Sequence, residues 1–137
     1  MIRVLSNDPR LQWEGAVSLQ MGDGWVQPWR LPFDEAPLWH DELRQRASTP
    51  AGVRIAFRTD ATTIGGCINR DETDWRLDLV IDGQFYASTE LACVETFQFT
   101  ELPTGMKVVE LWLPQRRVVQ VIHIDVNDNA QIEPYDD

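Results

Sequence analysis

The sequence is poor in basic residues and contains no cluster of them. Twelve Lys and Arg residues stand against twenty-two Asp and Glu residues, so the net charge at pH 7 is -10. Lys107 is the one lysine in the chain. A field of this sign repels phosphate backbones and anionic lipid headgroups. The composition therefore argues against nucleic acid and membrane surfaces as partners.

Long apolar runs are also missing, and cysteine is scarce. No window approaches the roughly 18 apolar residues of a membrane span, and the first residues lack the apolar stretch of a secretory signal. We therefore expect a cytoplasmic protein. Cys67 and Cys93 are expected to be reduced thiols, because disulfide frameworks belong to oxidising compartments and to more cysteine-dense chains.

The length allows one hydrophobic core. With 137 residues, of which 43% are hydrophobic and 25% charged, the chain falls in the range of ordinary globular domains. We predict a single domain over residues 1–137. The stretch from Asp125 to Asp137 holds five carboxylates and no basic residue. Residues 127–137 are therefore expected to form a linker-like acidic tail.

Short windows of apolar and polar alternation dominate the sequence, which is typical of half-buried β-strands. The clearest windows are Gly52–Thr59, Asp74–Asp82, Met106–Leu113 and Val118–Val126. The last is apolar on both faces, as a strand covered on both sides would be. Turn signals lie between them, at Gly22–Gly24, Gly65–Gly66, Asp82–Gly83, Pro103–Gly105 and Asn127–Asn129. Strands and turns of these lengths predict an antiparallel sandwich.

One segment has helical character. Pro37 stands at an early position, helix-forming residues follow, and Pro50 comes soon after the end. We predict one short helix over Pro37–Ala47, lying across an end of the sandwich. The predicted fold class is all-β, a jelly-roll-like antiparallel β-sandwich with one short helix.

Few residues offer catalytic chemistry. His40 and His123 are the two candidates for the base of a Ser-His-Asp triad, but neither stands in a catalytic motif. We expect His40 on the surface of the predicted helix and His123 as a partly buried, hydrogen-bonded residue. Cys67 and Cys93 lie in strand-like segments, where a thiol is usually buried and inert. The sequence therefore predicts no catalytic residue.

One stretch matches the spacing of a calcium loop. Asp125, Asn127, Asn129, Glu133 and Asp136 occupy positions 1, 3, 5, 9 and 12 of that pattern. Ala130 replaces the glycine that the loop needs, and Pro134 stiffens it, so we favour a hairpin turn. The cysteines and histidines have no zinc spacing. The sequence predicts neither a metal nor another cofactor.

Tryptophan is the least ordinary feature, with six residues at positions 13, 25, 29, 39, 75 and 112. Most of them are expected in the core or under the helix. Strand parity, however, places Trp112 and Glu110 on a non-core face, with Arg54 and Arg58 similarly placed on another strand. Aromatic and Arg side chains anchor protein interfaces, and Trp also stacks on sugars. Arg54, Arg58, Glu110 and Trp112 are therefore the predicted interface or ligand-binding residues.

Three blocks in a fixed order resemble a known family. They are Pro50–Ala61, Leu77–Gly83 and Leu102–Pro114, with Trp29–Pro32 upstream of them. Together they resemble the N-terminal β-sandwich, or jelly-roll, domain that precedes the catalytic domain in a group of bacterial SGNH (GDSL-type) hydrolases. The resemblance covers about residues 25–126.

The resemblance implies esterase chemistry in a following α/β domain, not in this chain. The family's catalytic blocks are missing here. Gly22-Asp23 is followed by Gly24 instead of Ser, Asn127-Asp128 lacks the glycine of G-x-N-D, and neither histidine has an Asp three residues before it. The family's activity is therefore assigned to no residue of this sequence.

These observations predict a non-catalytic N-terminal accessory domain of an SGNH/GDSL-type hydrolase. By resemblance, the parent protein would hydrolyse acyl esters, with carbohydrate esters among the candidates. Its partner would be the catalytic SGNH domain, in cis or in trans, or a second copy of the chain. Two alternatives stay open at this point: a free-standing carbohydrate-binding β-sandwich module, and a structural domain that only docks and solubilises its neighbour.

Overall fold

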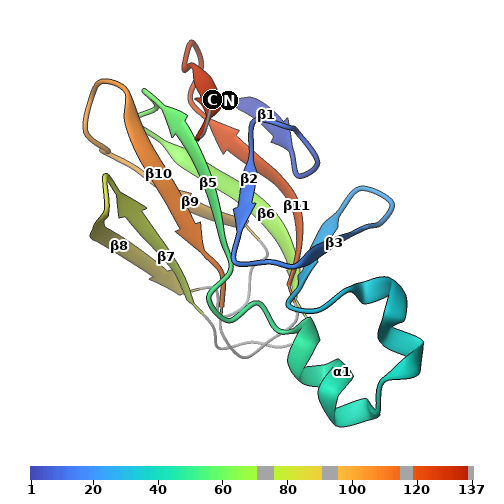
Figure 1. Cartoon of the computed structure of the whole chain (residues 1–137). Helices are drawn as coiled ribbons and strands as arrows, with labels where there is room; N and C mark the ends of the chain where they lie inside the picture. Colours follow the sequence, from blue (N-terminus) through green and yellow to red (C-terminus); the bar gives the residue numbers. More distant parts are fainter. Residues whose placement is uncertain (71–75, 91–95, 115–118, 136–137) are drawn as a thin grey trace.

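Two antiparallel β-sheets pack face to face and carry a helical excursion at one end (Figure 1). The computed structural model describes residues 1–70, 76–90, 96–114 and 119–135. The predicted all-β sandwich is confirmed. Among the described residues, no helix is long and apolar enough to cross a membrane.

In the part of the chain that the structure describes, each sheet has five strands in its main path and one further short strand. The first sheet runs β3 (Ser18–Met21), β4 (Val26–Trp29), β11 (Val119–Val126), β6 (Ile64–Arg70) and β9 (Thr96–Phe99), with β1 (Ile2–Leu5) also on β11. The second sheet runs β12 (Ile132–Pro134), β5 (Arg54–Thr59), β10 (Lys107–Trp112), β7 (Arg76–Ile81) and β8 (Gln84–Glu90), with β2 (Gln12–Glu14) also on β5. Cys67 lies half-buried in β6, and Cys93 lies outside the described residues.

The alternation in the sequence places one side of each central strand in the core. On β5, Ile55 and Phe57 are buried between the sheets, and Val109 and Leu111 are their equivalents on β10. The neighbours of these residues along each strand point to the outer face of the second sheet. Burial of this apolar surface is the main stabilising term of such a fold.

Strand β11 differs from its prediction as a strand covered on both sides. Its residues Gln120, Ile122 and Asp125 are half-buried, so only one side belongs to the core. The register against β6 shifts between Val121 and His123. This irregularity interrupts the alternation and lets the adjacent His123 and Ile124 both be buried.

The turn signals had two outcomes. Asp82 and Gly83, with φ of 50° and 82°, form the two-residue turn of the β7–β8 hairpin, as predicted. The Gly65–Gly66 turn was predicted wrongly, because both glycines lie inside β6. A Cβ atom on Gly65 would come within 2.6 Å of the Phe97 carbonyl oxygen, so glycine is required there by close packing.

The helical segment also differs from its prediction. Instead of one helix over Pro37–Ala47, there is a 3-10 helix, η1 (Phe33–Leu38), and an α-helix, α1 (Asp41–Ser48). Trp39 and His40 between them have extended backbone. Pro37 lies within η1, and the α-helix begins only after His40. We call residues 31–49 the helical appendage.

The predicted linker-like tail contains regular structure. Within residues 127–137, β12 pairs with the edge of β5, and Glu133 stands opposite Arg58. The described part of this segment is therefore attached to the sandwich as an edge strand. The acidic residues of the tail do not prevent pairing, because an edge strand keeps one side in water.

Lys107 is an unusual buried cation. It lies on the core side of β10, only 4% exposed, and its Nζ donates to the Gly105 carbonyl oxygen at 3.3 Å. Loss of hydration lowers the pKa of this ammonium below its ordinary value of 10.5, although the nearby Asp60 and Asp82 carboxylates partly offset the shift.

We expect the Lys107→Met substitution to raise the free energy of unfolding at pH 7 by about 1 kcal/mol, because a methionine is buried without loss of hydration. The folded chain releases its Lys107 proton before the unfolded chain does. Stability of the wild type therefore rises with pH between the folded pKa and 10.5, and the variant loses this rise. Urea unfolding at pH 7 and pH 10 measures both effects, with the exposed Arg3→Met as control. Equal pH dependence in wild type and Lys107→Met would contradict the prediction.

Candidate functional site

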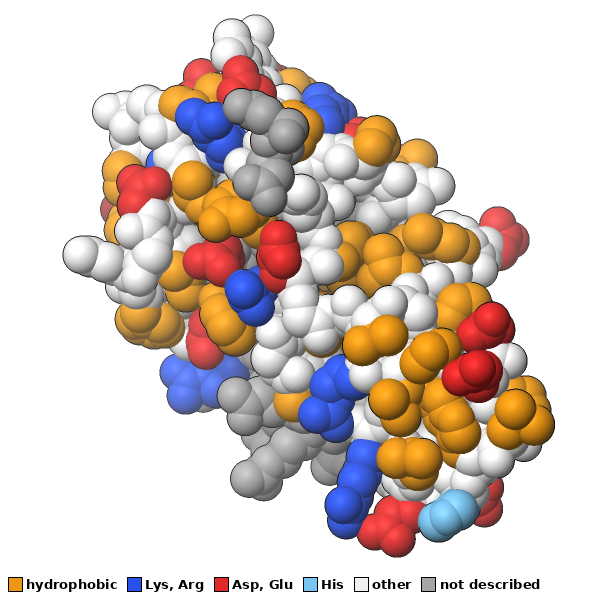
Figure 2. All heavy atoms as spheres, in the orientation of Figure 1, with side chains coloured by type: hydrophobic (Ala, Val, Ile, Leu, Met, Phe, Trp, Pro, Cys, Tyr) orange, Lys and Arg blue, Asp and Glu red, His pale blue; other side chains and the backbone are white. Residues whose placement is uncertain are grey.

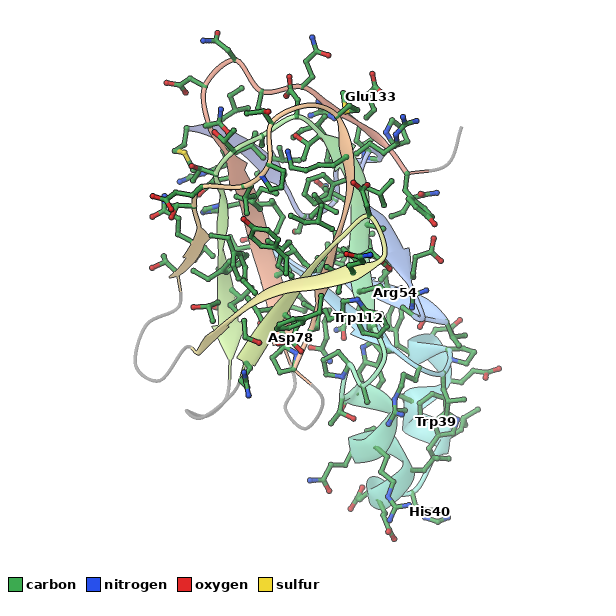
Figure 3. All side chains as sticks on the ribbon, turned by 90° about the vertical axis from the view of Figure 1, so that its left-hand side faces the viewer. Trp39, His40, Arg54, Asp78, Trp112 and Glu133 are labelled. Carbon is green, nitrogen blue, oxygen red and sulfur yellow. The ribbon has the colours of Figure 1, made fainter. Side chains whose placement is uncertain are left out.

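The outer face of the second sheet brings three of the four predicted site residues together. Strands β5 and β10 are adjacent and antiparallel, and Arg54 stands directly opposite Trp112. Arg54 Nε donates to Glu110 Oε2 at 2.8 Å. The guanidinium carbon of Arg54 also lies 4.8 Å from the centroid of the Trp112 ring. Figure 3 shows Arg54 and Trp112 close together on this side of the sandwich.

Arg54, Glu110 and Trp112 form a half-buried cluster, which we call the outer-face cluster. The Arg54 and Glu110 side chains are 29% and 21% exposed. Their ion pair is partly shielded from water, and the indole ring gives the guanidinium a cation–π contact. Each charge already has its partner. The cluster therefore stabilises the pairing of β5 and β10 whether or not another molecule binds.

Arg58 lies on the same face but at the other end of β5. It stands opposite Val108 on β10 and Glu133 on β12. Arg58 is half-buried and outside the outer-face cluster. The prediction that all four residues share one face agrees with the register, whereas their role in an interface or in ligand binding stays a prediction.

Two further residues extend the cluster across the sheet. Asp78 of β7 stands opposite Trp112, and Ser88 of β8 stands opposite Asp78. The Ser88 hydroxyl donates a short hydrogen bond to Asp78 Oδ1. Sequence analysis did not predict Asp78 and Ser88 as site residues, because alternation along one strand does not reveal which strands are neighbours. The Asp82–Gly83 turn signal lies between β7 and Gln84–Glu90. It could have indicated that Gln84–Glu90 forms a strand paired with β7.

Trp112 is less exposed than its parity suggested. Its ring is half-buried, and its Nε1 is buried with no hydrogen-bond partner among the described residues. A buried N–H without an acceptor costs about 1–3 kcal/mol. The unpaired Nε1–H group of Trp112 therefore lowers the stability of the folded chain.

The two histidines lie far from this cluster in the fold. His40 is exposed at the start of α1, while His123 is buried in β11 of the first sheet. The Nδ1 atom of His123 lies 3.0 Å from Asp125 Oδ1. Cys67 stands opposite His123 in the β6–β11 register. Neither histidine belongs to the outer-face cluster.

The Asn127 side chain of the calcium-loop pattern has protein partners. Asn127 Oδ1 accepts hydrogen bonds from the Thr62 and Thr63 backbone N–H groups at 2.8 and 3.1 Å. Asp125 Oδ1 lies 3.0 Å from His123 Nδ1, and Asp136 lies outside the described residues. Within residues 1–70, 76–90, 96–114 and 119–135, no group of three or more His, Cys, Asp and Glu side chains could hold a metal ion.

Comparison with known proteins assigns the fold to a family. The sequence pattern described as "SsfX3, N-terminal domain" matches residues 11–123. The chain belongs to the SsfX3 N-terminal domain family. A comparison with curated protein sequences finds no match.

Solved structures agree with this assignment. The chain is similar to a "Salicylyl-Acyltransferase SsfX3 from a Tetracycline Biosynthetic Pathway", with 31% identity and a TM-score of 0.92 over 100% of this chain and 42% of that chain. It also matches a putative GDSL-like lipase from Bacteroides ovatus, with 19% identity and a TM-score of 0.76 over 97% of this chain and 42% of that chain. The chain thus spans less than half the length of these two proteins.

A third structure shares only the fold. A family 35 carbohydrate binding module from an environmental isolate matches at 12% identity and a TM-score of 0.58, over 98% of this chain and 98% of that chain. At this identity the likeness concerns the β-sandwich itself, which serves many unrelated functions.

Proposed function

We propose that this SsfX3 N-terminal domain is the non-catalytic accessory domain of an SGNH/GDSL-type enzyme that acts on acyl groups. One observation carries the proposal: the whole chain matches 42% of a salicylyl-acyltransferase chain at 31% identity. The larger remainder of such a protein has room for the catalytic domain. The missing serine, oxyanion and histidine blocks in this sequence support the same division of labour.

The test compares the 137-residue chain with the complete polypeptide encoded by its reading frame. The isolated chain is expected to give no turnover of short-chain aryl esters, whereas the complete polypeptide, with an in-frame G-D-S block, hydrolyses them. His40→Ala and His123→Ala variants of the isolated chain serve as controls. Turnover by the isolated chain that disappears in either variant would overturn the accessory assignment, as would a reading frame without a catalytic domain.

Carbohydrate binding is the second candidate, and the outer-face cluster favours it. Trp112 is flanked by Arg54 and Asp78, and sugars bind to aromatic faces next to polar groups. The Arg54 guanidinium, however, already lies over the ring, so a sugar would have to displace it. Affinity electrophoresis in polysaccharide gels tests this candidate, with retardation lost in Trp112→Ala as the supporting result.

A further inference from the structure

The helical appendage exposes apolar side chains that the sandwich does not cover. Leu38 at the end of η1 is 84% exposed, and Leu43 in α1 is 41% exposed. Within α1, only Ala47 and Ser48 are buried. Figure 2 shows hydrophobic side chains gathered over this part of the molecule, on the face in view. Exposed apolar side chains that gather in one place are candidates for a contact surface.

Hydrogen bonds hold the appendage together and attach it to the first sheet. Arg44 donates to the carbonyl oxygens of Ala36 and Trp39 at 3.1 and 2.9 Å, which links η1 to α1. The Arg30 backbone N–H donates to the Ala47 carbonyl oxygen at 2.8 Å. A segment that is ordered before binding loses less conformational entropy on binding than a segment that becomes ordered only in the complex.

Two further contacts attach the appendage to β3 and β4. Ser18 Oγ accepts a hydrogen bond from the Phe33 backbone N–H at 3.0 Å and donates to the Leu31 carbonyl oxygen at 2.9 Å. The rings of Trp29 and Trp39 lie with centroids 6.4 Å apart. Leu38 and Leu43 are therefore presented on a preformed surface.

We propose that the apolar surface of the appendage, including Leu38 and Leu43, docks the catalytic domain of the same polypeptide. This inference rests on the proposed function. The outer-face cluster is a weaker candidate for this contact, because its charges are already paired and burying them against a partner would cost hydration.

The size and position of the occupant support this assignment. If 137 residues are 42% of the whole, about 190 residues remain, and a domain of that size is about 40 Å across. Both termini lie at the end of the sandwich opposite the appendage (Figure 1). A strand of eight residues, such as β11, spans only about 26 Å. A catalytic domain that begins near the C-terminus can thus lie along the sandwich and reach the appendage.

Charge defines the chemistry of the partner surface. The basic residues Arg44 and Arg46 are engaged within the appendage, Arg46 in an ion pair with Glu42 at 2.8 Å. Asp34 and Glu35 are exposed and form no ion pair with the described residues. The docking surface of the catalytic domain is therefore expected to be apolar with Lys or Arg at its rim.

The test uses the complete polypeptide carrying Leu38→Glu and Leu43→Glu together. The double substitution Phe85→Glu and Met106→Glu is the matched control. It adds the same charge at exposed apolar residues on the side of the second sheet. The Leu38 and Leu43 variant is expected to increase the rate of proteolytic cleavage between the domains at least tenfold, since cleavage follows the population of the open form. The control is expected to stay near the wild-type rate.

Three other outcomes overturn the proposal. Equal cleavage of wild type and the Leu38 and Leu43 variant would place the docking surface elsewhere. A wild-type dimer in sedimentation that this variant dissociates, at an unchanged cleavage rate, would identify a second copy as the occupant. A complete polypeptide that has no catalytic domain, or that does not hydrolyse esters, would overturn the proposed function itself. This result is independent of the cleavage rate, so it is distinguishable from a failure of the docking proposal alone.

Discussion

Replacing Gly66 with alanine is expected to destabilise the folded chain by about 3 kcal/mol. Gly66 lies in β6 between two neighbouring strands of the first sheet. A Cβ atom there would come within 2.5 Å of the His123 carbonyl oxygen and 2.8 Å of Phe97 Cζ. The phenyl ring could rotate away, but the carbonyl oxygen belongs to the paired backbone of β11. The methyl group therefore forces two central strands apart.

Gly24→Ala is the control for this substitution. Gly24 has a φ of 80° in the β3–β4 turn, and nothing lies within 4 Å of its added Cβ atom. Only backbone strain opposes alanine there, at about 1–2 kcal/mol. Urea unfolding followed by circular dichroism compares the two variants. A Gly66→Ala loss no larger than that of Gly24→Ala would show that β6 and β11 can separate cheaply.

The turn prediction failed at Gly65–Gly66 for a physical reason. A glycine pair signals a turn because glycine accepts backbone conformations that other residues avoid. In β6 the same residues serve a different purpose, which is close approach of another strand. Composition alone cannot separate these two uses, because the close contact is made by residues distant in sequence, such as Phe97 and His123.

Strand positions were predictable where packing has a period of two. The alternation around Ile55, Leu79 and Leu111 located β5, β7 and β10, since each of these strands has one side in the core. The irregular β11 and the divided helical appendage were not predictable in the same way. A register shift and a break at Trp39 and His40 depend on tertiary contacts that leave no periodic signal.

The candidate site was predictable only as a face. Parity correctly placed Arg54, Glu110 and Trp112 on one side of their strands, because a strand exposes every second residue. The adjacency of Asp78 and Ser88 needed the strand order of the sheet. The burial of Trp112 Nε1 needed the neighbouring side chains, which no strand pattern contains.

Trp112→Ala is expected to lower the free energy of unfolding of the isolated chain by about 2–3 kcal/mol, below the usual cost for a fully buried tryptophan. The ring is half-buried and supports the Arg54 guanidinium, so its removal exposes the β5–β10 surface and leaves the Arg54–Glu110 pair more hydrated. Part of the loss is recovered, because the substitution also removes an N–H group without an acceptor. Chemical unfolding of the isolated chain measures the net effect.

Trp112→Phe separates packing from hydrogen bonding and tests the predicted contact of this face. Phenylalanine keeps most of the ring and removes the buried Nε1, so the isolated chain is expected to stay within about 1 kcal/mol of wild type. If the catalytic domain or another partner contacts the exposed part of the ring, Trp112→Ala weakens that association, whereas Trp112→Phe keeps most of it. Sedimentation of the chain and interdomain cleavage of the complete polypeptide measure the association. A large stability loss in Trp112→Phe would instead mean that the indole edge packs more tightly than its half-burial suggests.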